Sequence, residues 1–190
     1  MHAVHHFSER GIFCKLLERR QNDGCRPLKI SVNFSKITLF ESEILTVIEG
    51  IISKYNIDKK FIEVEITESI SGMGKNILCR IAQDIKNSGF SLSLDDFGIK
   101  HSNLSSLADV SFDVIKLDKS LIHSLIDNTS NRIILKNIIN MCNELGSKVI
   151  AEGVETVEQE QILADLGCRF VQGYLYGKPM PVEEFKQKYC

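Results

Sequence analysis

The chain has 190 residues, of which 43% are hydrophobic and 25% are charged, and these values are typical of one globular domain with a sizeable core. Its formal net charge of -2 gives no broad attraction to a nucleic acid polymer or an anionic membrane. No apolar run reaches the roughly 18 residues of a membrane span, and the six cysteines show no Cys-x-x-Cys spacing. Residues 1–10 lack the apolar core of a secretion signal, so we expect reduced thiols and a cytoplasmic location.

Short β-branched runs alternate with helix-period stretches along the chain. The runs that predict strands are 28–34, 61–67, 90–95, 112–118, 148–152 and 170–174. The stretches that predict helices are 41–55, 74–88, 131–145 and 156–166, with shorter helical or turn segments at 104–108 and 119–126. Strands separated by helices of this length indicate βαβ units, and therefore a parallel sheet in an α/β protein.

Several residues mark where the predicted helices begin and end. Gly89 and Gly146 follow two helices as stop signals, while Thr156 and Gln159 have the spacing of a capping box that opens another. The chain has only three prolines and no repeat, so we expect a single domain without a linker. Six strands suit an open doubly wound sheet, because a closed (β/α)8 barrel needs eight strands and about 250 residues.

Polar side chains follow each predicted strand near its carboxyl end. They are Asn33, Glu65 with Glu68, Asp95 with Asp96, Lys116 with Asp118, Glu152 with Glu155, and Gln172. Parallel strands bring their carboxyl ends to one face, so we expect these side chains to form one site. Their oxygen atoms suit Mg²⁺ or Mn²⁺ better than Zn²⁺.

The adjacent carboxylates Asp95 and Asp96 could serve two cations, with Asp95 as the bridge. Two metal ions about 3.5–4 Å apart can clamp a phosphodiester and activate a water for in-line attack. Lys116 would then neutralise charge or orient that water. Each residue also has a purely structural interpretation: an Asx-turn for the two aspartates, a turn cap for Asn33, a solvent-facing Glu65, and for Lys116 an ion pair with Asp118.

Six segments of the sequence carry a resemblance to a known family. They are ISVNFS (30–35), VEITES (64–69), LSLDDFG (92–98), IKLDKS (115–120), VIAEGVET (149–156) and VQGYLYGKPMP (171–181). Together they resemble the EAL domain, the cyclic di-GMP phosphodiesterase module of bacteria. The resemblance implies a TIM-like (β/α) barrel that uses two Mg²⁺ or Mn²⁺ ions to cut cyclic di-GMP to linear pGpG. It also implies a helical segment over 1–29 that leads into a barrel over 30–190.

The resemblance assigns roles to the residues at the strand ends. Its metal ligands correspond to Asn33, Glu65, Asp95 and Asp96, and Glu152 corresponds to an acid beside the metals and the attacking water. Lys116 corresponds to a lysine that orients this water. The remaining positions correspond to residues that contact substrate or support the site: Gln172, Asp118, Glu155 and Glu68, the last of which steadies the loop after the DDFG strand.

Two departures from the family pattern leave several functions open. The opening Glu-Ala-Leu segment has no counterpart, which predicts about six of eight barrel strands and the loss of one glutamate ligand and a phosphate-contacting arginine. The loop after Asp96-Phe97-Gly98 reads Ile99-Lys100-His101, where the family has Thr-Gly-Tyr. The chain could therefore be an active phosphodiesterase, an inactive nucleotide- or protein-binding module, or a segment of a longer signalling protein.

The family also indicates partners. The resemblance is compatible with a homodimer and with an upstream sensory or diguanylate-cyclase-like domain in a longer protein. Outside the family, a sugar-phosphate or metal-dependent TIM-barrel enzyme would need a phosphate-binding glycine loop near the last strands. Gly167 and Gly173 are the residues that could supply one.

Overall fold

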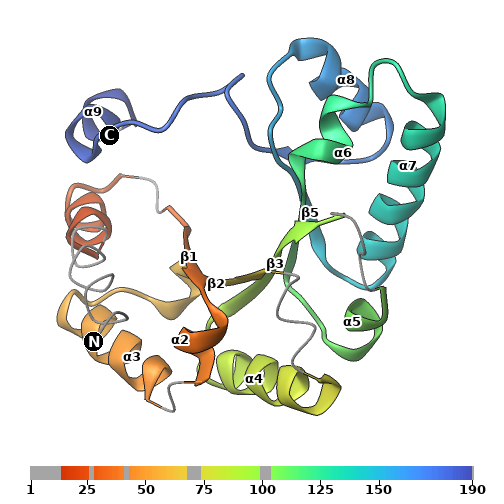
Figure 1. Ribbon diagram of the computed structural model, residues 1–190. Helices are drawn as coiled ribbons and strands as arrows, with labels where there is room; N and C mark the ends of the chain where they lie inside the picture. Colours follow the sequence, from red (N-terminus) through yellow and green to blue (C-terminus); the bar gives the residue numbers. More distant parts are fainter. Residues whose placement is uncertain (1–13, 26–27, 41–42, 68–73, 99–103, 190) are drawn as a thin grey trace. The chain divides into compact units, whose positions relative to one another are not determined.

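A computed structural model describes residues 14–25, 28–40, 43–67, 74–98 and 104–189. Within these ranges the strands form where the β-branched runs predict them (Figure 1). They are β1 (Ile30–Phe34), β2 (Ile62–Thr67), β3 (Ser91–Phe97), β4 (Val114–Leu117), β5 (Lys148–Ala151) and β6 (Phe170–Val171). These six strands belong to one sheet in the order β1-β2-β3-β4-β5-β6, which confirms the predicted α/β class.

Helices separate the strands. They are α2 (Lys36–Phe40), α3 (Ile44–Lys54), α4 (Lys75–Asn87), α5 (Leu104–Asp109), α6 (Lys119–His123), α7 (Thr129–Glu144), α8 (Val157–Asp165) and α9 (Val182–Tyr189). Residues 14–22 are also helical, and a 3-10 turn, η1 (Lys59–Phe61), leads into β2. Of the helices that the structure describes, none combines the length and the apolar character that a membrane crossing requires.

The predicted helix ends are confirmed where the signal is local. Thr156 and Gln159 form the capping box at the start of α8, with the Gln159 backbone N–H donating to the Thr156 hydroxyl at 3.2 Å. Gly89 and Gly146 have positive φ angles of 83° and 80°, as expected of glycines that end helices. The sequence patterns missed α2 and α9, although Pro181 stands directly before α9 as a start signal.

The chain divides into two compact units. Unit 1 comprises 1–65, 83–91 and 180–190, and unit 2 comprises 66–82 and 92–179. Of the predicted site residues, Asn33 and Glu65 therefore belong to unit 1, and those from Asp95 to Gln172 belong to unit 2. Glu68 and the altered loop at 99–103 lie outside the described residues.

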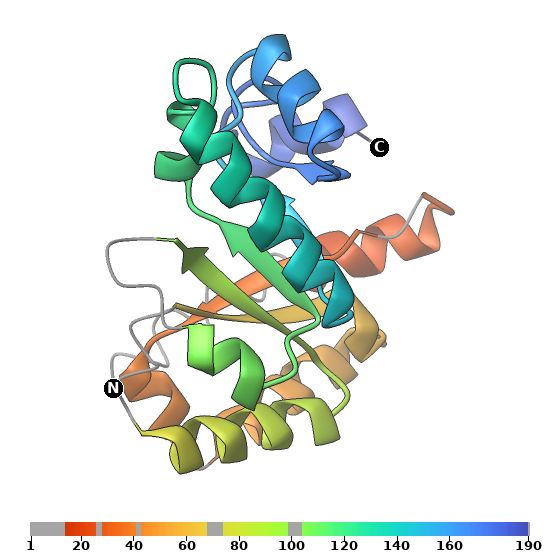
Figure 2. The ribbon, with the colours of Figure 1, turned by 90° about the vertical axis from the view of Figure 1, so that its right-hand side faces the viewer.

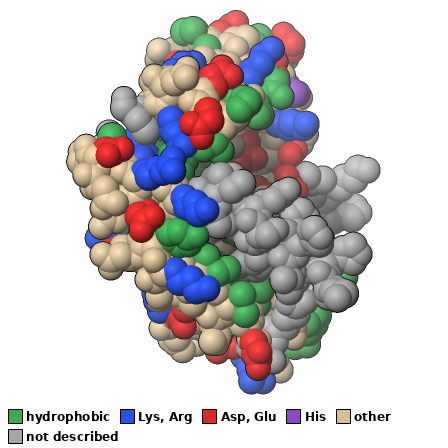
Figure 3. Space-filling model, turned by 90° about the vertical axis from the view of Figure 1, so that its left-hand side faces the viewer, with side chains coloured by type: hydrophobic (Ala, Val, Ile, Leu, Met, Phe, Trp, Pro, Cys, Tyr) green, Lys and Arg blue, Asp and Glu red, His purple; other side chains and the backbone are tan. Residues whose placement is uncertain are grey.

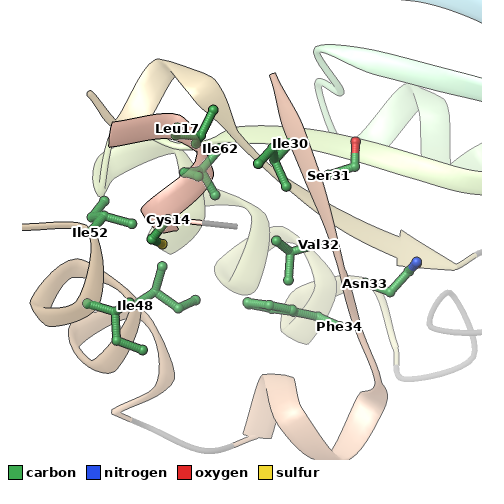
Figure 4. A pocket seen from close by; sticks show the side chains of 11 residues that line it. Cys14, Leu17, Ile30, Ser31, Val32, Asn33, Phe34, Ile48, Ile52 and Ile62 are labelled. Atoms are coloured by element: carbon green, nitrogen blue, oxygen red, sulfur yellow. The ribbon is translucent and has the colours of Figure 1, made fainter. Parts of the chain in front are cut away.

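Alternation along β1 separates an apolar side from a polar side in unit 1. Ile30, Val32 and Phe34 point into a cavity of about 230 Å³, whereas Ser31 and Asn33 point away from these three (Figure 4). The other walls come from the helix at 14–22, α3 and β2, and they are lined by Cys14, Leu17, Ile48, Ile51, Ile52 and Ile62. Ser31 and Asn33 also border the cavity, but its lining carries no carboxylate and no cation, so the cavity alone does not form the predicted site.

Unit 2 holds a parallel ladder in which β4 pairs with β3 and β5, and β5 pairs with β6. The helix α7 runs along the outer side of β4 and β5 (Figures 1 and 2). Its apolar stripe of Leu135, Ile139 and Cys142 is fully buried, as is Ile115 of β4. Complete burial of one such aliphatic side chain contributes roughly 1.5–3 kcal/mol, so the burial of this stripe stabilises unit 2.

Charged side chains of opposite sign are mixed on the face that Figure 3 presents, with lysines and arginines beside aspartates and glutamates. This mixing agrees with the formal net charge of -2. Among the residues that Figure 3 colours by type, we see no broad patch of one sign that would suit a polymeric polyanion.

Candidate functional site

The two adjacent aspartates lie at a shift of register between β3 and β4. Leu94 is opposite Ile115, but Phe97 is opposite Leu117, so three steps along β3 match two steps along β4. The extra residue falls within Asp95-Asp96, and Asp96 has a left-handed φ of 58°. In a regular strand two successive side chains would point to opposite faces. A bulge of this kind re-aims one of them, which allows both carboxylates to serve one site.

Lys116 and Glu152 form an ion pair across the neighbouring strands, with 3.2 Å between Lys116 Nζ and Glu152 Oε1. The register places Lys116 opposite Ile150, and Glu152 follows Ile150 by two residues on the same face. The Lys116 side chain is 8% exposed and that of Glu152 is 23% exposed. A buried ammonium is thus held beside a carboxylate at the carboxyl ends of β4 and β5.

Backbone hydrogen bonds continue the ladder past the strand ends and align the residues that follow them. The Asp118 N–H donates to Phe97 O at 3.0 Å, and the Glu152 N–H donates to Leu117 O at 3.0 Å. The Gln172 N–H donates to Ala151 O at 2.8 Å. These hydrogen bonds align three segments at the carboxyl ends of the strands. We call them the β3 turn (96–98), the β5 turn (152–154) and the β6 turn (172–173).

Negative charge accumulates at the β3 turn. The pKa of Asp96 is raised above its ordinary value, first by desolvation and then by the charges of Asp95 and Asp118, against the opposing effect of Lys116 and Lys119. Asp95 Oδ1 is buried and accepts no hydrogen bond from the described part of the chain. Buried carboxylate oxygens are normally paired, so an orphaned one indicates a missing positively charged or donating partner.

Three further predicted residues have mainly structural contacts. Asp118 caps α6, because its Oδ1 accepts from the Ser120 N–H at 2.8 Å. The side chains of Glu155 and Gln172 are exposed, and the Glu155 backbone N–H donates to Gln159 Oε1 at 2.8 Å. The ladder brings Gln172 to the same strand end as Glu152, but the structure gives Glu155 no contact with the other site residues of unit 2.

In unit 1 the alternation of β2 buries two acids on one face. Glu65 is 3% exposed, which contradicts the alternative that it faces solvent. Glu63, equally buried, is not among the predicted site residues; it accepts from Ser31 Oγ at 3.0 Å and pairs with Lys29 Nζ at 3.2 Å. The signal was present, since residues two apart on a strand share a face. Asn33 is exposed on β1.

The donor set suits a hard divalent cation, although the described residues contain no cluster of three His, Cys, Asp or Glu side chains placed to hold a metal ion. Asp95 and Asp96 supply carboxylate oxygens, and one of these oxygens is buried without a partner among the described groups. Carboxylate and amide oxygens are the ligands that Mg²⁺ and Mn²⁺ prefer. The residues therefore fit a metal of this class at the β3 turn.

Comparisons with known proteins point to one family. The model of the EAL domain matches residues 10–179. Signaling protein YkoW of Bacillus subtilis (strain 168) is 34% identical over 160 residues, which are 84% of this chain and 20% of YkoW. Cyclic di-GMP phosphodiesterase PdeR of Escherichia coli (strain K12) is 32% identical over 162 residues, which are 85% of this chain and 24% of PdeR. The chain thus spans between a fifth and a quarter of the length of these curated relatives.

A solved structure agrees with this result. The EAL enzyme Bd1971, in its form with cAMP and cyclic-di-GMP bound, superposes on the chain with a TM-score of 0.86 at 27% sequence identity. The match covers 93% of this chain and 48% of that chain. This likeness confirms the expected fold class, a TIM-like α/β architecture of EAL type.

Proposed function

Because the chain belongs to the EAL domain family, we propose that it is a cyclic di-GMP phosphodiesterase domain, which hydrolyses cyclic di-GMP to linear pGpG. The observation that supports this most strongly is the buried Lys116–Glu152 ion pair next to the Asp95-Asp96 bulge. A positive group and a set of carboxylates at adjacent strand ends are what a metal-dependent attack on a phosphodiester requires.

The proposed metal ligands of unit 2 are the carboxylates of Asp95, Asp96 and Glu152. The family resemblance also assigns metal ligands to Asn33 and Glu65, which belong to unit 1. Bound Mg²⁺ or Mn²⁺ would supply Lewis-acid polarisation of the phosphate and a water that is deprotonated near neutral pH. The lone pairs of Asp95 Oδ1 are available for this purpose, since no described group donates to that oxygen.

Lys116 has a different role in the proposal. Its ammonium carries three N–H donors and no acceptor, and the ion pair with Glu152 fixes its position. At this strand end the ammonium is placed where it could orient an attacking water or a phosphate oxygen. Gln172, at the neighbouring strand end, would contact the substrate with its amide. These assignments, the homodimer, the upstream domain and the cytoplasmic location stay predictions.

A second function, binding of cyclic di-GMP without cleavage, is favoured by one sequence feature. Ile99-Lys100-His101 follow the β3 turn where the EAL pattern has Thr-Gly-Tyr. A glycine that permits a positive φ has been replaced by a lysine, which makes the same loop conformation costly. Affinity for the nucleotide could then persist while the metal ions are held too loosely for turnover.

The deciding experiment measures products and binding on the same preparation. The purified chain is incubated with cyclic di-GMP and Mn²⁺, and pGpG is separated by chromatography, with Asp96→Asn as the inactive control. Isothermal titration with cyclic di-GMP in Ca²⁺ is run in parallel. Production of pGpG by the wild type alone supports the phosphodiesterase. Binding without pGpG supports the second function, and a folded chain that neither binds nor cleaves would refute both.

A further inference from the structure

The helix α6 follows directly after Asp118 and lies against two of the turns that carry site residues. It comprises Lys119–His123 and begins after its cap residue Asp118. Backbone hydrogen bonds from Asp118 to Phe97 and from Glu152 to Leu117 bring the β3 turn and the β5 turn next to the segment that leads into this helix. Each of these turns contains a glycine with a left-handed backbone, with φ of 109° at Gly98 and 71° at Gly153. Both glycines stand within two residues of a predicted metal ligand.

Leu121 occupies the space that a side chain on Gly98 would need. A Cβ built on Gly98 would lie 2.3 Å from Leu121 Cδ1 and 3.0 Å from Leu121 Cγ. Real Cβ atoms essentially never come this close to another carbon. The β3 turn is therefore in direct contact with the leucine side chain, and this contact limits where the preceding residue, Phe97, and Asp96 can move.

The β5 turn is held from the same helix. A Cβ on Gly153 would lie 2.4 Å from Lys119 Cβ and 3.3 Å from Lys119 Cα. Lys119 is the first residue of α6, and the contact involves its Cβ and Cα atoms. The contact therefore does not depend on the position of the Lys119 ammonium. One short helix thus touches both turns, one after each of the strands that flank β4.

We propose that α6 is a positioning element for the site, in which Leu121 holds the β3 turn and Lys119 holds the β5 turn. The helix fixes the distance between the carboxylate pair of β3 and the carboxylate of Glu152. Neither α6 residue touches a reacting atom in this proposal; they act through the two turns. The inference rests on the proposed function, since the positioned groups are its metal ligands.

The test compares two leucines of unit 2 that are both partly buried. Leu121→Ala removes the side chain above Gly98, and Leu166→Ala is the matched control, since Leu166 caps α8 at the opposite ends of the strands. Leu121→Met is the conservative variant. Binding of Mn²⁺ is measured from the electron paramagnetic resonance signal of the free ion, and thermal unfolding is recorded for every variant.

We expect Leu121→Ala to weaken Mn²⁺ binding by about 10-fold or more, as is typical when the support of a metal ligand is removed. Leu166→Ala should leave the dissociation constant unchanged even though it lowers the unfolding midpoint. Leu121→Met should restore Mn²⁺ binding to within about 2-fold, because this exchange conserves volume. Equal Mn²⁺ affinity in Leu121→Ala and the wild type would overturn the positioning role while leaving the proposed function intact.

A second pair of variants keeps the test independent of folding. Gly98→Ala introduces the clash with Leu121 and also strains the left-handed backbone. In the Leu121→Ala background only the strain remains, so we expect Gly98→Ala to reduce Mn²⁺ affinity less there than in the wild type. Identical losses in both backgrounds would contradict the inference. A folded wild type that binds no Mn²⁺ would remove the proposed function and the inference together.

Discussion

Replacing Lys116 by methionine removes the positive charge from the ion pair with Glu152 and keeps a side chain of similar length. The two charges are 3.2 Å apart, and the Lys116 side chain is 8% exposed. At an effective dielectric constant near 20, their attraction is about 5 kcal/mol before desolvation is subtracted. Breaking a fully buried pair typically costs about 3–5 kcal/mol, and the 23% exposure of Glu152 reduces this value.

We therefore expect Lys116→Met to lower the free energy of unfolding by about 2 kcal/mol, which is roughly 4–8 °C in Tm for a chain of this size. Turnover of cyclic di-GMP should fall by about 10²–10⁴-fold if Lys116 orients the attacking water. Lys136→Met on the exposed side of α7 is the matched control, and it should change neither quantity.

A double-mutant cycle with Glu152→Gln assigns the loss to the pair. Once Glu152 is neutral, Lys116→Met no longer leaves a carboxylate without its partner, so its effect on stability should shrink by at least about 1 kcal/mol. The assay is urea unfolding of the four variants, followed by circular dichroism. If the stability effects of the two single variants add up to that of the double variant within about 0.5 kcal/mol, the ion pair makes no specific contribution to stability. The pairing of Lys116 with Glu152 would then be wrong.

Three other variants test the site and its supports. The pKa of Asp96 is raised on folding, so the free energy of unfolding should decrease as the pH rises from the unfolded-state pKa through the folded-state pKa. Asp96→Asn should abolish this contribution to the pH dependence of stability. The variant should also have a higher Tm in EDTA at neutral pH, and it should lose Mn²⁺ binding. Thr156→Ala should cost about 1 kcal/mol of stability in urea unfolding and leave turnover unchanged, because it removes only the cap of α8. Gly173→Ala would place a Cβ 2.1 Å from Val154 O, so we expect loss of substrate affinity together with a lower Tm. A slope that persists in Asp96→Asn, an inactive Thr156→Ala, or a fully active Gly173→Ala would each count against the corresponding contact.

The strands and the main helices were predictable because their signals are local. A β-branched run or a capping box depends on residues within a few positions, and the structure confirms both kinds of signal. Helix starts were less accurate: α7 begins at Thr129 after the cap residue Asn128, whose Oδ1 accepts from the Asn131 N–H at 3.1 Å, whereas the apolar pattern begins only at Asn131. A cap lies before the apolar pattern, so periodicity alone places the start too late.

The register between strands could not be predicted from one sequence. Pairing of Leu94 with Ile115 and of Phe97 with Leu117 depends on contacts between residues 21 and 20 positions apart. The sequence allowed an ion pair between Lys116 and Asp118, which is two residues further along the chain. In the structure Lys116 pairs with Glu152, and Asp118 caps a helix. Both outcomes are decided by tertiary packing, which the order of residue types does not encode locally.

The bulge explains why two carboxylates can be adjacent at the end of β3. A left-handed aspartate costs roughly 1–2 kcal/mol and, here, the neighbouring negative charges add repulsion. Such a conformation persists only when its surroundings over-determine it. Both residues that follow Asp96 are held: Phe97 O accepts from the Asp118 N–H, and Leu121 fills the space above Gly98. A strained and repulsive pair of carboxylates does not stabilise the fold, and a bound cation, as in the proposed function, would relieve the repulsion that the fold itself leaves in place.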